Sequence, residues 1–84
     1  MANDKKFYYV GVQTEDGMRL VTSEEGKTAY WNKDEKPMCY PTKRWAQETA
    51  FGLVCNMYPA VVIESIFEIK RQMFALKEVE ATEK

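Results

Sequence analysis

The stretch CYPTKRWAQETAFGLVCNM (Cys39–Met57) carries the strongest local signal in the chain and decides what fold we expect. Thr42 stands where a helix N-cap is expected, because its hydroxyl can accept a free backbone N–H, so the helix should begin at Lys43. It should end near Asn56, since Tyr58-Pro59 follows. One half of this helix is expected to face the core, through Trp45, Ala46, Thr49, Ala50, Leu53, Val54 and Met57.

The other half of the expected helix is mostly polar but carries Phe51 and Cys55 one turn apart. Its members are Arg44, Gln47, Glu48, Phe51 and Cys55. The pattern leaves open whether Phe51 and Cys55 contact anything. Gly52 lies inside the helix, where glycine costs up to about 1 kcal/mol relative to alanine, so we interpret it as a sign of close packing.

Three strands are expected before the helix. Aromatic and β-branched residues predict a strand over Phe7–Thr14, followed by strands at Met18–Ser23 and Thr28–Asn32. Asp16-Gly17 is a hairpin signal between the first two, because glycine tolerates positive φ, and Gly26 marks the next turn. Residues 1–6 are polar, and we expect them to be disordered.

The chain after Pro59 supports two interpretations. Alternation favours a strand from Ala60 to about Glu68. Spacing of Ile66, Ile69, Met73 and Leu76, with a capping-box pattern at Ser65 and Glu68, favours a helix instead. We expect a strand first and then a helical or frayed tail over residues 71–84.

These elements together predict an α+β fold. We expect one domain over residues 7–70, with a mainly antiparallel four-stranded sheet in the order of elements βββαβ and one helix packed on one face of the sheet. A chain of 84 residues has room for one small core.

Composition excludes several classes of function. The sequence contains no histidine, so it offers no Ser-His or Cys-His nucleophile pair, and we expect neither catalytic residues nor an enzyme. Two cysteines without other soft ligands argue against a structural zinc site, and we expect no metal and no cofactor.

The sequence permits a Cys39–Cys55 disulfide, but two thiols without a secretory signal favour the reducing cytoplasm. The longest apolar run, AVVI, is far too short to span a membrane.

An uncovered apolar face is the candidate binding surface. One helix can cover only one face of a sheet, and strand alternation separates Tyr8, Val10 and Val12 from Tyr9. If the first set faces the helix together with Leu20, Val61 and Ile63, an apolar patch is left on the other face. Its expected members are Tyr9, Val21, Trp31 and Ile66. Either the C-terminal segment covers this patch, or another protein or a second copy of the chain binds there.

A nucleic-acid function is the alternative. Lys43 and Arg44 stand at a helix N-terminus, where phosphate can bind, and Lys70-Arg71 adds a second basic pair. The net charge is −1, from 12 basic and 13 acidic residues, so no broad positive field supports binding to nucleic acid or to an anionic membrane. We therefore expect nucleic acid to be a less favoured partner than protein.

The order of these motifs resembles the small βββαβ hypothetical proteins of Gram-positive bacteria and their phages. The matching pieces are Tyr8-Tyr9-Val10, Asp16-Gly17 to Leu20, Tyr40-x-Thr42-x-x-x-Ala46 and Val61 to Glu64, within residues 7–67. The chain departs from that pattern at Tyr40, where those proteins have Phe, and in its longer C-terminal segment. The resemblance implies the fold and an accessory role of the phage or mobile-element type, acting through protein interaction, and it carries no functional residues.

Overall fold

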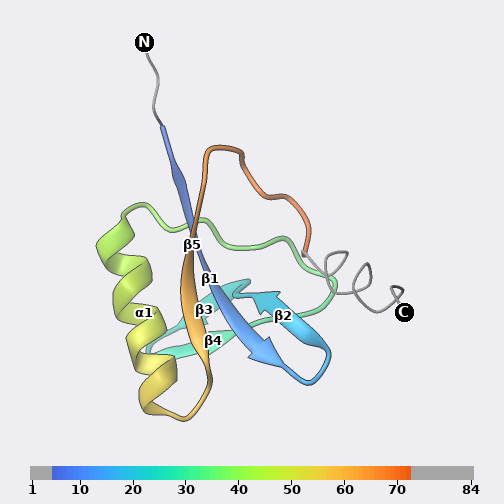
Figure 1. Cartoon of the computed structure of the whole chain (residues 1–84), viewed down its shortest axis with the longest axis vertical. Helices are drawn as coiled ribbons and strands as arrows, with labels where there is room; N and C mark the ends of the chain where they lie inside the picture. Colours follow the sequence, from blue (N-terminus) through green and yellow to red (C-terminus); the bar gives the residue numbers. More distant parts are fainter. Residues whose placement is uncertain (1–4, 73–84) are drawn as a thin grey trace, which may run out of the picture.

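β1 (Phe7–Thr14) is the central strand of the protein and organises the rest of the chain. The computed structural model describes residues 5–72. β2 (Gly17–Leu20) pairs with one side of β1 and β5 (Ala60–Ser65) with the other, both antiparallel. The helix α1 (Lys43–Cys55) packs against β1 and β5, as Figure 1 shows.

A separate two-stranded sheet, formed by β3 (Ser23–Glu25) and β4 (Thr28–Tyr30), corrects the expected single four-stranded sheet. The α+β class is confirmed, but the five strands form sheets of three and two. The expected strand Met18–Ser23 is divided where Val21 N–H donates to Val10 C=O at 2.9 Å and Thr22 N–H donates to Tyr30 C=O at 2.7 Å. Residues 21 and 22 therefore bond to different sheets, which alternation in the sequence does not reveal.

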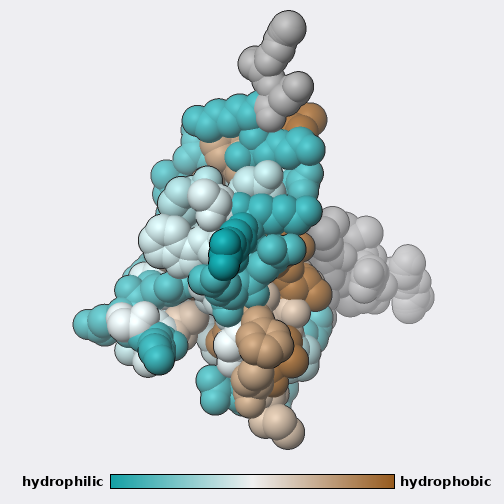
Figure 2. Space-filling model, turned by 90° about the vertical axis from the view of Figure 1, so that its left-hand side faces the viewer, coloured by the Kyte–Doolittle hydropathy of each residue, from teal (hydrophilic) through white to brown (hydrophobic). Residues whose placement is uncertain are grey.

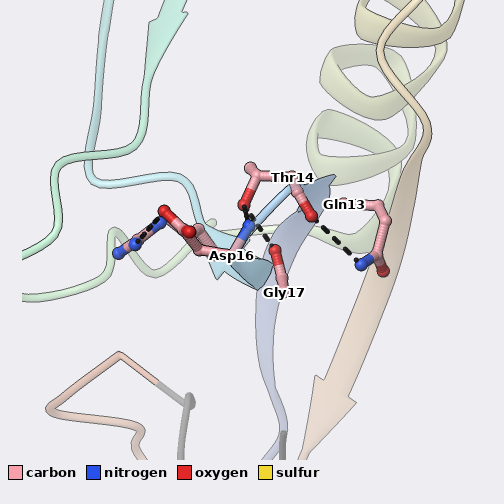
Figure 3. Close-up of polar contacts among 5 residues, drawn as sticks. Gln13, Thr14, Asp16 and Gly17 are labelled. Carbon is pink, nitrogen blue, oxygen red and sulfur yellow. Dashed lines mark hydrogen bonds and ion pairs between the residues drawn. The ribbon is translucent and has the colours of Figure 1, made fainter.

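The first hairpin closes through Thr14 and Gly17, which face each other across the β1–β2 register. Gly17 has φ 111°, a value that glycine tolerates, so the glycine signal marked the right turn. The two loop residues are Glu15 and Asp16, one position earlier than expected. Figure 3 shows that the Thr14 hydroxyl donates to Gly17 C=O at 2.7 Å and accepts from Asp16 N–H at 3.1 Å.

The helix has the expected ends but a narrower core face. Thr42 caps it by accepting from Trp45 N–H at 3.1 Å, and Asn56 is the C-cap residue. Its buried residues are Ala46, Ala50 and Leu53. Three of the seven residues of the expected contact face are exposed, because small alanines bring the helix close to the sheet along one narrow stripe. The exposed members are Trp45, Val54 and Met57.

The two faces of the sheet are exchanged on β5 relative to the expectation. Val10 lies opposite Val62, and Val12 lies opposite Ala60, so the even-numbered residues of β5 face the helix. Val61 and Ile63 therefore lie on the other face, contrary to the expected pairing with the helix. A shift of one residue in the register of a strand exchanges all of its side chains between faces, and the sequence does not determine that register.

Residues 66–72 cover the face of the sheet that α1 leaves open. Ile69 N–H donates to the Tyr9 hydroxyl at 2.7 Å. The Gln72 side-chain amide accepts from Leu20 N–H at 2.7 Å and donates to Leu20 C=O at 3.0 Å. The strand ends at Ser65, earlier than the expected Glu68. Residues 1–4 of the expected disordered N-terminus and residues 73–84 of the expected tail, with Met73 and Leu76, lie outside the described residues.

Two glycines predict opposite responses to a side chain. A Cβ at Gly11 would meet Met18 Sδ at 2.7 Å and Ile63 Cδ1 at 3.0 Å, whereas a Cβ at Gly52 would meet nothing within 4 Å. Gly52 therefore does not mark close packing, contrary to our expectation.

Gly52→Ala should raise the free energy of unfolding by about 0.5–1 kcal/mol. Gly11→Val should lower it by about 1–3 kcal/mol through overpacking. Urea unfolding checks both, and a destabilised Gly52→Ala variant would contradict the assignment.

Candidate functional site

The four residues expected to form an exposed apolar face do not lie together on the surface. Tyr9 and Val21 are 0% exposed, Trp31 is partly buried and Ile66 is exposed. Tyr9 is covered because residues 66–72 cross its face, and Val21 belongs to the core on the helix side. The Trp31 ring meets the Tyr58 ring edge-on at 5.2 Å. These four residues therefore do not form one exposed binding surface.

The expected phosphate contacts lie in two separate places. Arg44, at the start of α1, pairs with Glu48 at 3.3 Å, and both side chains are largely exposed. Lys70 and Arg71 instead line a shallow depression beside residues 33–36, where the acidic Asp34 and Glu35 lie between two lysines. The start of α1 and residues 70–72 lie on opposite sides of the molecule in Figure 1. The four basic residues therefore do not make one positive surface.

The remaining chemical candidates are few. Cys39 and Cys55 are both free and exposed, so the disulfide that the sequence permitted is absent. In residues 5–72, no group of three or more His, Cys, Asp or Glu side chains is placed to hold a metal ion. Within the same range, no helix is long and apolar enough to cross a membrane.

A groove between α1 and the β3–β4 hairpin contains the main buried polar network. The Tyr40 hydroxyl and the Thr49 hydroxyl both donate to Glu24 Oε2, the latter at 2.7 Å. Burial raises the pKa of the Tyr40 phenol, and the hydrogen bond to the Glu24 carboxylate raises it further. The groove, of about 410 Å³, is lined by Glu24, Gly26, Lys27, Ala29, Trp45, Glu48, Thr49, Gly52, Leu53 and Asn56. This network fixes the hairpin against the helix. The sequence gave no signal for the network, because its members, Glu24, Tyr40 and Thr49, lie far apart in the chain.

The outer edge of β5 is open, because β5 has no second strand neighbour among residues 5–72. Gln13 N–H donates to Pro59 C=O at 2.9 Å, which extends the β1–β5 ladder by one hydrogen-bonded pair. Such pairs alternate along an antiparallel ladder. Positions 61, 63 and 65 therefore also bond to β1, whereas the backbone N–H and C=O groups of Ala60, Val62 and Glu64 point away from it.

The opposite edge of the same sheet is protected at Leu20, near the end of β2. The outward-facing backbone groups of Leu20 are both bonded by the Gln72 amide, which takes the place of a neighbouring strand. Met38 N–H donates to Val21 C=O at 2.8 Å just beyond the end of β2. Open edges are normally protected in this way because they can pair with other chains. Among residues 5–72, no segment bonds to the outer edge of β5 in this way.

Exposed apolar side chains flank the open edge. Phe51 is 69% exposed, and Val54 and Val61 are each 49% exposed. Val54 shares a depression with Ala60 and Val61, which places it beside β5, and Phe51 precedes Val54 by one helical turn. Figure 2 shows hydrophobic side chains gathered toward the lower part of the side that carries α1. We call this set the β5 edge surface: Phe51, Val54 and Val61 together with the outward backbone of Ala60, Val62 and Glu64.

Comparison with known proteins identifies no relative. No protein-family model matches the chain, and no match was found among the curated proteins or the solved structures that were searched. The sequence pointed to one part of the β5 edge surface, since Phe51 stood out on the polar half of the helix, but it gave no sign that β5 would be an edge strand.

The Tyr40–Glu24 contact predicts a specific loss of stability at high pH. Tyr40 has a pKa above its ordinary value of 10.0 in the folded protein, so its contribution is complete below that pH and is lost as the pH rises further. Tyr40→Phe should lower the free energy of unfolding by about 1–2 kcal/mol at neutral pH. Its stability should also fall less steeply than that of the wild type above about pH 10.

Urea unfolding across this alkaline range checks the prediction, and Tyr30→Phe, at an exposed tyrosine of β4, is the matched control. The control should match the wild type at neutral pH. Parallel pH profiles for Tyr40→Phe and the wild type would contradict the role assigned to the Tyr40 hydroxyl.

Proposed function

We propose that the protein is a non-enzymatic interaction protein whose partner pairs with the β5 edge surface. The observation that carries this proposal is the combination of an unpaired strand edge with exposed apolar side chains beside it. Backbone hydrogen bonds at such an edge supply affinity, and neighbouring side chains supply specificity. Phe51 is the natural anchor, because large aromatic side chains dominate the energy of protein interfaces.

The chemistry of the chain is consistent with binding without catalysis. The sequence has no histidine, and the most enclosed carboxylate of the groove, Glu24, is occupied by two hydroxyl donors. An accessory role of the phage or mobile-element type, suggested by the resemblance described above, belongs to the same proposal. The two free thiols fit a reducing compartment, and we propose the cytoplasm as the site of action.

The nucleic-acid alternative has weaker support. It requires Lys43, Arg44, Lys70 and Arg71 to contact one backbone, because affinity for nucleic acid depends on several phosphate contacts. The basic pairs lie on opposite sides of the molecule, and Arg44 is already paired with Glu48. Filter binding at low and moderate salt checks this alternative, and salt-sensitive binding that is lost in a Lys43→Ala/Arg44→Ala variant would favour it over the protein interaction.

A cross-linking experiment tests the proposed interaction surface. A photoreactive amino acid placed at Phe51 should cross-link to a protein partner in the source cell, whereas one at Phe67 should not. Phe67 is the matched control, because it is 72% exposed and lies beyond the end of β5. Adding Val61→Lys should reduce the cross-linked fraction at position 51 at least about tenfold, since it places a charge in the interface.

Mass spectrometry of the cross-linked product then identifies the partner protein. Equal cross-linking from positions 51 and 67, or no effect of Val61→Lys, would contradict the proposal.

A further inference from the structure

We infer that the partner at the β5 edge surface is a second copy of this chain, joined through a two-fold axis at Val62. This inference rests on the proposed function, since it assigns an occupant to the same surface. In the dimer, β5 pairs antiparallel with β5 of the second copy, and the two three-stranded sheets become one continuous sheet of six strands. The backbone register of β5, the position of Phe51 and the charges at the ends of α1 all suit this pairing.

The outward backbone groups of β5 are self-complementary about Val62. With the axis there, Val62 faces Val62 of the second copy, and Ala60 faces Glu64 at both ends. Each pair can exchange two backbone hydrogen bonds, so every outward-facing group of the strand is used. Centring the axis on Glu64 would place like charges opposite each other, which is destabilising. Centring it on Ile63 would leave Ala60 opposite Ile66, beyond the end of the strand.

The same axis brings the exposed apolar side chains together. Val61 faces Ile63 of the second copy on the side of the sheet away from α1, which makes a cross-strand pair of β-branched residues. On the other side, Val54 lies level with Ala60, because the two line one depression. Moving two residues along β5 to Val62 covers about 7 Å, which corresponds to roughly four residues of helix. The helix residue level with the axis is therefore near Phe51, and the two Phe51 rings meet.

The charges at the ends of α1 suit this arrangement. α1 has no acidic residue in its first turn and no basic residue in its last turn. The two helices run antiparallel in the dimer, so Lys43 of each copy lies toward the C-terminal end of the other helix, where the helix dipole favours a cation. Glu64 is paired with Lys6 at 2.9 Å, and its neighbours across the axis, near Pro59 and Ala60, are uncharged. No like charges are forced together.

Sedimentation equilibrium at micromolar concentration tests the stoichiometry. The wild type should have twice the 9.8 kDa mass of one chain. Phe51→Glu and Phe51→Lys should each raise the dissociation constant of the dimer at least about tenfold, because each places like charges at the axis. An equimolar mixture of these two variants should recover the dimer through opposite charges. Phe67→Ser is the control and should remain dimeric.

Amide hydrogen exchange tests the strand pairing without a change in β5 itself. The Val62 N–H points out of the monomer, so its exchange in the wild-type dimer should be at least about tenfold slower than in monomeric Phe51→Glu. The Ile63 N–H, which bonds to β1, should be protected in both proteins. This comparison also shows whether the variant remains folded.

A wild type that sediments as a single chain of 9.8 kDa would overturn the inference. So would a dimer that survives both Phe51 charge variants, or a Val62 amide that exchanges equally fast in both proteins. A monomeric wild type that still cross-links a different protein through position 51 would remove the second copy as partner while leaving the proposed function in place. Absence of any cross-link at position 51 would remove both.

Discussion

The hydrogen bond from the buried Tyr40 hydroxyl to the Glu24 carboxylate is the contact on which the arrangement of the molecule depends. Tyr40 also bonds through its backbone to Tyr8 of the central strand, at 2.7 Å, and its ring meets Trp45 edge-on. Glu24 accepts from Thr49 of α1 as well. One residue, Tyr40, therefore connects β1 through its backbone with the β3–β4 hairpin and the helix through its side chain. A buried contact of this kind is costly to leave half-made, so the three elements hold their positions together.

That arrangement determines which edge of the main sheet is open. The segment between β4 and α1 passes beside β2, where Met38 and Tyr40 make their backbone bonds, and residues 66–72 return to the same edge to place Gln72 against Leu20. Both connections thus protect the β2 side, and neither reaches the outer side of β5. The proposed interaction surface follows from this asymmetry within residues 5–72. Its apolar members favour contact with another protein over exposure to water. They are Phe51, Val54 and Val61.

The candidate site could be predicted from the sequence only in part. Phe51 was noticed because a large aromatic on the polar half of a helix breaks the expected pattern, and its exposure agrees with that signal. Tyr9 lies on the expected face, which the segment after β5 covers, as one of the two alternatives allowed. Val21 was misplaced, because it lies beyond the end of β2 and packs in the core on the helix side. Both outcomes depend on contacts between residues far apart in the chain, such as Ile69 with Tyr9, which no local pattern contains.

The sequence by itself determined the local elements: the strand Phe7–Thr14, the Thr42 cap and the helix from Lys43, and the turn at Gly17. These depend on residues within a few positions of each other, where steric and hydrogen-bonding preferences of the backbone decide the outcome. The tertiary structure alone decided the division into two sheets, the face that each β5 residue occupies and the protection of one edge. Those features depend on strand register and on long-range packing, in which a shift of a single residue changes which side chains are buried.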